Sequence, residues 1–147
     1  MTGKRIILSL LMTVIATIAW AQDGLSIENV FNRYHNRKNA VEVIVSGKQL
    51  RPYDMTFFHS INITAAAAEL LTIEPFVSAD IKGAVSQETG KIGSHIYYGF
   101  YSLKPRNGVN RYIIYRNRSL KHGGKSDATL IYIEGNASMQ QIKKRFQ

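Results

Sequence analysis

The sequence contains no cysteine. This absence excludes disulfide bonds, a catalytic thiolate, zinc–thiolate clusters and lipid attachment through a cysteine. The composition is otherwise ordinary, with 45% hydrophobic and 20% charged residues in a chain of 147, which excludes collagen-like, low-complexity and wholly disordered proteins. We therefore expect residues 22–147 to form one domain that is stable through its packed core alone.

The sequence also lacks a recognisable catalytic or cofactor motif. The four histidines are scattered along the chain: His35, His59, His95 and His122. No two of them have the spacing of metal ligands on one helix or strand, so no metal site is expected. The segment 122–126 ends like a phosphate-binding loop, but the position that requires the first glycine is Ser119. There is no Gly-x-Ser-x-Gly elbow for a serine nucleophile either, so we expect no catalytic residues and no cofactor.

No apolar run is long enough to span a bilayer, which takes about 20 residues. The longest one, from Ile6 to Ala19, follows Lys4 and Arg5 and ends in Ala-Trp-Ala. A positive start, a short apolar stretch and small residues at the exit are typical of a secretory signal peptide. We expect residues 1–21 to be removed, leaving no membrane span. An exported domain without cysteine fits a bacterial periplasm or cell surface better than eukaryotic secretion.

The rest of the chain alternates helix and strand patterns. A stripe of Ile27, Val30, Phe31 and Tyr34 predicts an amphipathic helix over 25–37, capped by Ser26. Ser138 and Gln141 form a capping box that opens the last helix. Alternating or β-branched runs predict strands at 40–46, 55–64, 95–103, 109–118 and 128–134, with short helices at 65–71 and 76–85 and a polar connection at 87–93.

This order has no regular strand–helix–strand rhythm, so a doubly wound parallel sheet is not expected. The predicted fold is α+β: a mainly antiparallel sheet of about five strands, with the N- and C-terminal helices packed on one face. The strands at 95–103 and 109–118 carry apolar residues on both faces. Their second face therefore needs a further layer, a partner or a dimer mate.

Positive charge is concentrated in the predicted hairpin. No acidic residue lies between Thr89 and Ser126, whereas eight basic residues and five tyrosines do. Basic residues interleaved with aromatic ones can bind polyanions. The residues we select as an interaction surface are Tyr97, Tyr101, Arg106, Arg111, Tyr112, Arg116, Arg118 and Lys121. The competing interpretation is a solvated, charged edge that keeps the hairpin soluble.

Several segments carry a resemblance to known proteins: Asp23–Ile27, the aromatic helix around Phe31–Tyr34, Tyr97–Tyr101, Asn110–Asn117 and Leu130–Gly135. Together they resemble small exported proteins of Bacteroidetes that are grouped in families of unknown function. The resemblance implies an envelope location and a small α+β domain, and it supplies no catalytic residues.

Three hypotheses for function remain. The leading one is a non-enzymatic envelope module that binds a polyanion or an envelope protein through the basic, tyrosine-rich hairpin. The second is a small-ligand binder or minor hydrolase with a pocket between sheet and helices, which would bring His59 or His95 together with an acid such as Glu69 or Asp80. The third is a structural subunit whose tyrosine face forms a homodimer interface.

Overall fold

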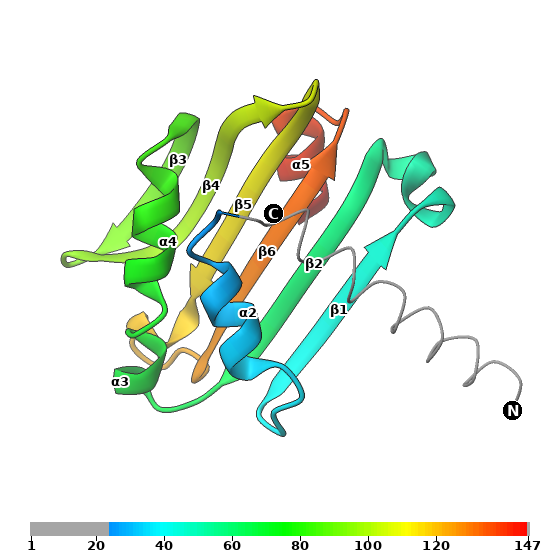
Figure 1. The fold of residues 1–147 in the computed structure, drawn as a ribbon. Helices are drawn as coiled ribbons and strands as arrows, with labels where there is room; N and C mark the ends of the chain where they lie inside the picture. Colours follow the sequence, from blue (N-terminus) through cyan, green and yellow to red (C-terminus); the bar gives the residue numbers. More distant parts are fainter. Residues whose placement is uncertain (1–23, 147) are drawn as a thin grey trace, which may run out of the picture.

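A computed structural model describes residues 24–146, so the expected signal peptide at 1–21 lies outside the described residues. Figure 1 shows one sheet with helices on both sides. In chain order the elements are α2 (Glu28–Tyr34), β1 (Ala40–Ser46), η1 (Lys48–Tyr53), β2 (Met55–Thr64), α3 (Ala67–Leu70), α4 (Glu74–Ile81), β3 (Ala84–Ile92), β4 (His95–Arg106), β5 (Val109–Asn117), η2 (Arg118–Leu120), β6 (Asp127–Gly135) and α5 (Met139–Phe146).

The six strands form one sheet in the order β1-β2-β6-β5-β4-β3, and every neighbouring pair is antiparallel. The α+β fold with an antiparallel sheet is confirmed, but the sheet has six strands rather than about five. The additional strand is β3, which contains most of the segment predicted as a polar connection. β3 lies at the edge and most of its residues are exposed or half-buried, so its sequence lacks the apolar alternation that marks a half-buried strand.

Helices pack against both faces of the sheet. The front face packs against α2, α3 and α4, and the rear face packs against η1 and α5. Strand β6 shows why two layers are needed, because Leu130 and Tyr132 point to the front cluster while Ile131 and Ile133 point to the rear one. The prediction that both terminal helices share one face was therefore wrong. Helix α5 instead lies on the rear face, where it forms the second helical layer together with η1.

Helix α2 buries the predicted stripe, with Ile27 and Val30 fully enclosed. Its first turn, however, is not capped by Ser26. The carboxylate of Asp80 on α4 instead accepts the backbone N–H of Ser26 at 2.7 Å and of Ile27 at 2.8 Å. An acidic group at a helix N-terminus satisfies otherwise unpaired donors. Because Asp80 is distant from α2 in the sequence, the residues around the start of α2 could not reveal this cap.

The β4–β5 hairpin turns through two residues rather than the five expected. Arg106 pairs with Val109, and Asn107 and Gly108 both have positive φ, 54° and 74°. Two successive left-handed residues make the tight hairpin turn that Asn-Gly favours. The proline of this segment lies within β4.

Helix α5 begins with the predicted capping box. The backbone N–H of Ser138 donates to Gln141 Oε1 at 2.7 Å, and the N–H of Gln141 donates to Ser138 Oγ at 3.2 Å. Ile142 is buried and Met139 packs beside it, so this part of the sequence interpretation is confirmed. The other predicted helices are shorter than expected, and Pro75 stands in the first turn of α4 instead of interrupting a helix.

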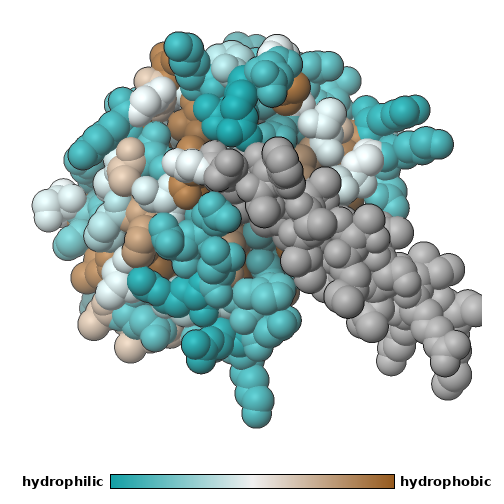
Figure 2. Space-filling model, viewed as in Figure 1, coloured by the Kyte–Doolittle hydropathy of each residue, from teal (hydrophilic) through white to brown (hydrophobic). Residues whose placement is uncertain are grey.

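Hydrophilic side chains cover most of the front of the molecule, with hydrophobic ones showing between them in small areas (Figure 2). Within the part of the chain that the structure describes, no helix has the length and apolar character needed to cross a membrane.

Candidate functional site

The eight residues selected from the sequence do not form one surface. Tyr101 and Tyr112 are in the core, with 0% and 3% of their surface exposed. The hydroxyl of Tyr101 accepts a hydrogen bond from Thr89 Oγ1 at 3.1 Å on the front side. The hydroxyl of Tyr112 donates to the carbonyl of Ala137 at 2.6 Å on the rear side. Both rings therefore support the fold and neither is accessible to a partner in this structure.

Arg106 and Arg111 lie near the turn of the hairpin and are held by neighbouring groups. Arg106 Nη2 is 3.9 Å from Glu134 Oε1. Arg111 donates through Nε and Nη2 to the carbonyl of Lys104, at 3.1 and 2.9 Å. At this end of the hairpin the guanidinium groups are thus partly engaged by other groups of the protein.

Tyr97, Arg116, Arg118 and Lys121 lie at the opposite end. Arg116 pairs with Tyr98, close to the start of β4, whereas Arg106 pairs with Val109 at the turn. At about 3.3 Å per residue, Arg116 is roughly 23 Å along β5 from Val109, the partner of Arg106, and roughly 17 Å from Arg111. The structure thus divides the acid-free window into two basic regions.

The second region borders a groove of about 250 Å³ on the rear face. Its apolar floor consists of Phe100, Ile114 and Ile131, which are 2%, 7% and 9% exposed. We call it the arginine groove; its lining is Tyr98, Phe100, Ile114, Tyr115, Arg116, Arg118, Thr129, Ile131 and Phe146. The groove joins the end of α5 to the ends of β4, β5 and β6.

The two arginines of the groove differ in their surroundings. The side chain of Arg116 is exposed and has neither a hydrogen bond nor an ion pair among the described residues. Arg118 is fixed by Asp127, through Nε to Oδ1 at 2.6 Å and through Nη2 to Oδ2. Asn62 supports the same carboxylate at 3.1 Å. The hydrogen bonds from Arg118 lower the pKa of Asp127 below its usual value, so the pair stays ionised at neutral pH and holds the Arg118 guanidinium in place.

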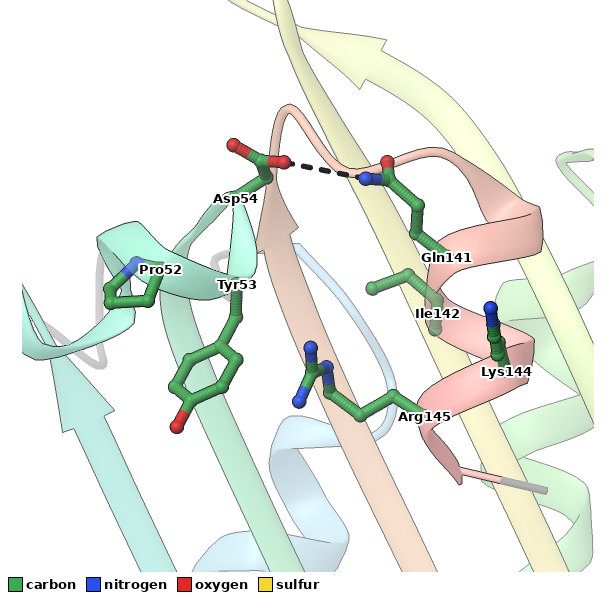
Figure 3. Close-up of a pocket in the computed structure, with 7 residues that line it drawn as sticks. All are labelled: Pro52, Tyr53, Asp54, Gln141, Ile142, Lys144 and Arg145. Carbon is green, nitrogen blue, oxygen red and sulfur yellow. Dashed lines mark hydrogen bonds between the residues drawn. The ribbon is translucent and has the colours of Figure 1, made fainter.

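A second hollow, of about 420 Å³, lies between η1 and α5. Figure 3 shows Arg145 and Tyr53 pointing toward one another across it, with the guanidinium carbon 4.3 Å from the ring centroid. Gln141 Nε2 donates to Asp54 Oδ2 at 3.3 Å at its other end, and Lys144 also lines it. We call it the Tyr53 hollow.

The contribution of α5 and η1 to the rear face was not predicted from the sequence. The basic residues in the last turn of α5 suit the negative end of the helix dipole, but Arg145 and Lys144 also line the Tyr53 hollow. Phe146 stacks on Phe58, with ring centroids 5.8 Å apart, and also lines the arginine groove. Only the basic composition at the end of α5 could have pointed to these residues.

Two histidines that are distant in sequence meet at one carboxylate on the front side. His59 Nε2 lies 2.6 Å from Glu42 Oε2, and His35 Nδ1 lies 2.7 Å from Glu42 Oε1. The His59 ring is 1% exposed and stacks on Phe31 at 3.7 Å. Burial lowers the pKa of His59. Burial alone would raise the pKa of Glu42, but hydrogen bonds from the two histidines outweigh it and lower that pKa.

His59 and His95 each lie beside an acid, as the second hypothesis expected, but the acids named as examples, Glu69 and Asp80, are not their partners. His95 Nδ1 instead lies 2.8 Å from Glu74 Oε2, His59 contacts Glu42, and Asp80 caps α2. A side chain as enclosed as His59 cannot reach a substrate, and its contacts serve the core. Among residues 24–146 no group of three or more histidine and acidic side chains could hold a metal ion.

Comparison with known proteins gives one match. A family model described as "Family of unknown function (DUF6108)" matches residues 14–146, a range that includes every described element. No curated protein and no solved structure matches the chain.

Proposed function

The chain belongs to this family of unknown function, and we propose that it is an exported, non-catalytic module of the cell envelope that binds a polyanionic partner. One observation carries the proposal: the arginine groove joins two guanidinium groups to an aromatic and aliphatic floor. A sulfated or phosphorylated polysaccharide has the matching chemistry, because its charges can meet the arginines while its sugar rings lie against the aromatic side chains.

Electrostatics favour an anion at this groove. None of the described side chains that line it is acidic, and Asp127 behind it is already neutralised by Arg118. Arg116 has no carboxylate to satisfy it and is free to bind one from outside. Arg116 at the rim of an apolar groove therefore attracts negative charge with little competition from the protein, whereas the Arg118–Asp127 pair adds no net charge.

The arrangement of the rear face favours a polymer over a single small anion. The Tyr53 hollow repeats the same chemistry on another part of α5, with Arg145 and Lys144 beside the ring of Tyr53. A chain of repeating anionic units can contact both places, whereas one small molecule can fill only one of them. Aromatic rings beside basic groups are the surface that flexible polyanions use.

The test is retention on an immobilised sulfated polysaccharide, eluted with rising salt. Arg116→Glu should elute at clearly lower salt than the parent protein. Lys82→Glu is the matched control, because it makes the same change in net charge at an exposed residue after α4, on the front side. By analogy with phosphate contacts, loss of one contact should lower the log–log salt dependence of binding by about 1.

Equal elution of the two variants would contradict the proposal, since it would show that net charge alone retains the protein. If the parent protein bound a sulfated disaccharide as tightly as the polymer, the ligand of the arginine groove would be a small anion and not a polyanion. Protein chains that contain residues 22–147 are suitable for this test, because they include every described element of the fold.

A further inference from the structure

Strand β1 is an edge strand without the features that normally protect an edge. It is the last strand in the sheet, and its seven residues, Ala-Val-Glu-Val-Ile-Val-Ser, include no proline, glycine or lysine. Its pairing with β2 runs from Ala40 to Ser46 without a register shift. Natural edge strands are usually interrupted by bulges, prolines or charges, because a regular uncharged edge pairs with other strands.

The opposite edge of the same sheet shows this protection. Strand β3 has two register shifts in its pairing with β4, and Gly90, Glu88 and Lys91 lie along it. Bulges and charges of this kind block strand addition. The contrast indicates that β1 can pair with a further strand, whereas β3 is protected against such pairing.

Among the described residues, the backbone of β1 presents groups without partners in its middle, whereas the N–H of Ala40 at its start donates to the carbonyl of Arg37. The N–H of Gly47 donates to Thr56 and the carbonyl of Asn39 accepts from Thr64, so odd-numbered residues of this strand bond to β2. Because hydrogen-bonding direction alternates along a strand, the N–H and C=O groups of Glu42 and Ile44 point away from β2.

The side chains of β1 add apolar surface to this edge. Val41 and Val43 are 67% and 44% exposed, and their pairing with Asn62 and Ser60 places them on the rear face. The one charged side chain, Glu42, points to the front, where the two histidines bind it. The only carboxylate of β1 is therefore held by hydrogen bonds on the front side, away from the exposed valines.

We propose that β1 pairs with β1 of a second copy of this chain, in an antiparallel register centred on Val43. In this register Val43 faces Val43 of the second copy, Val41 faces Val45, and Glu42 faces Ile44. The outward backbone groups of Glu42 and Ile44 then form hydrogen-bonded pairs, and Val43 occupies the closer, non-hydrogen-bonded position. The two sheets would join into one continuous sheet about a two-fold axis.

The occupant is a second copy because β1 is complementary to itself. Its valines at 41, 43 and 45 are symmetric about the centre, so each meets a valine across the interface, and β-branched cross-strand pairs are stabilising. No like charges face each other in this register. Centring the pairing on Glu42 would place two carboxylate-bearing residues opposite one another, and centring it on Ile44 would leave Ala40 and Val41 without strand partners. The proposal does not depend on the polyanion site.

Cysteine cross-linking tests the register directly, since the chain has no cysteine of its own. Directly opposite residues at a non-hydrogen-bonded position have Cα atoms about 4.5 Å apart, within the range that a disulfide spans. Under mild oxidation Val43→Cys should form a covalent dimer almost completely. Val85→Cys, at an exposed valine on β3, should remain monomeric. Failure of Val43→Cys to cross-link, or equal cross-linking of both variants, would overturn the proposal.

Light scattering over a concentration series provides the second measurement. The mass of the parent protein should rise toward twice the monomer value. Val43→Lys places two like charges face to face and should keep the protein monomeric, whereas Val85→Lys and the neutral Val43→Thr should still dimerise. A monomer mass for the parent at every concentration, or dimers of Val43→Lys as stable as the parent's, would contradict the inference. Circular dichroism verifies that each variant is folded.

Discussion

Acid should destabilise this protein through one buried side chain, His59. The ring is 1% exposed and donates to Glu42 at 2.6 Å while stacking on Phe31. Burial is the largest cause of its lowered pKa, and it outweighs the hydrogen bond to Glu42, which acts in the opposite direction. The folded protein therefore holds His59 in its neutral form.

The direction and size of this loss of stability follow from the difference in proton binding between the folded and unfolded states. In the unfolded chain histidine takes up a proton near pH 6.5, and in the fold it does so only at lower pH. Below pH 6.5 the unfolded state thus binds more protons, so the stability that is complete above this value is lost as the pH falls. At about pH 5.5 the loss can reach roughly 1.4 kcal/mol, which corresponds to one pH unit. The lowered pKa of Glu42 adds to the loss only below its unfolded value of 4.5.

Urea unfolding at about pH 7.5 and about pH 5.5 measures this difference. His59→Phe retains an aromatic ring against Phe31 and removes the titrating group. Its free energy of unfolding should therefore differ much less between the two pH values than that of the parent protein. His122→Gln, in an exposed loop, is the control and should behave as the parent does. If His59→Phe shows the same acid-dependent loss as the parent, another group is responsible and the reasoning is wrong.

Three further substitutions test the packing by thermal or urea unfolding. Ser138→Ala removes half of the capping box with Gln141 and should cost about 1 kcal/mol. Gly99→Ala places a methyl group where the buried ring of Tyr101 lies and should cost about 1–3 kcal/mol; an unchanged midpoint would show that the ring can move aside. Tyr112→Phe removes the 2.6 Å hydrogen bond to the carbonyl of Ala137, which keeps only the longer one from Asn110 Nδ2 at 3.4 Å, and should cost about 0.5–1.5 kcal/mol.

Local patterns predicted those elements whose signals are local. The strands at 40–46 and 55–64 agree with β1 and β2 in both bounds, because β-branched runs between turn residues identify strands without reference to the rest of the chain. The stripe of α2 and the capping box of α5 are also confirmed, since each depends on residues within two helical turns.

Features that depend on distant contacts could not be predicted. β3 is recognisable only through its pairing with β4, because an exposed edge strand needs few apolar residues. The face that α5 covers depends on the path of the chain after β6, and the cap of α2 comes from Asp80. Likewise, the acid-free window is continuous in sequence, but the length of β5 separates Arg111 from Arg118. Sequence proximity therefore overstated the size of the basic surface.

The two proposed interfaces would reinforce each other. A two-fold axis perpendicular to the sheet keeps both rear faces on the same side, so a β1–β1 dimer would present two arginine grooves to one polymer. A long sulfated chain can bind both and gain avidity, typically 10²- to 10⁴-fold, whereas a short oligosaccharide can fill only one groove. Val43→Lys should thus weaken binding of the long chain and leave that of the short one unchanged, while Arg116→Glu weakens both. Salt separates the interfaces further. It weakens polyanion binding, but it screens the repulsion between two copies and so favours the dimer; residues 22–147 carry a formal charge of +7, since Lys4 and Arg5 account for the rest of the +9 of the full chain. A Val43→Lys variant that binds long and short chains as the parent does would show that the grooves act singly.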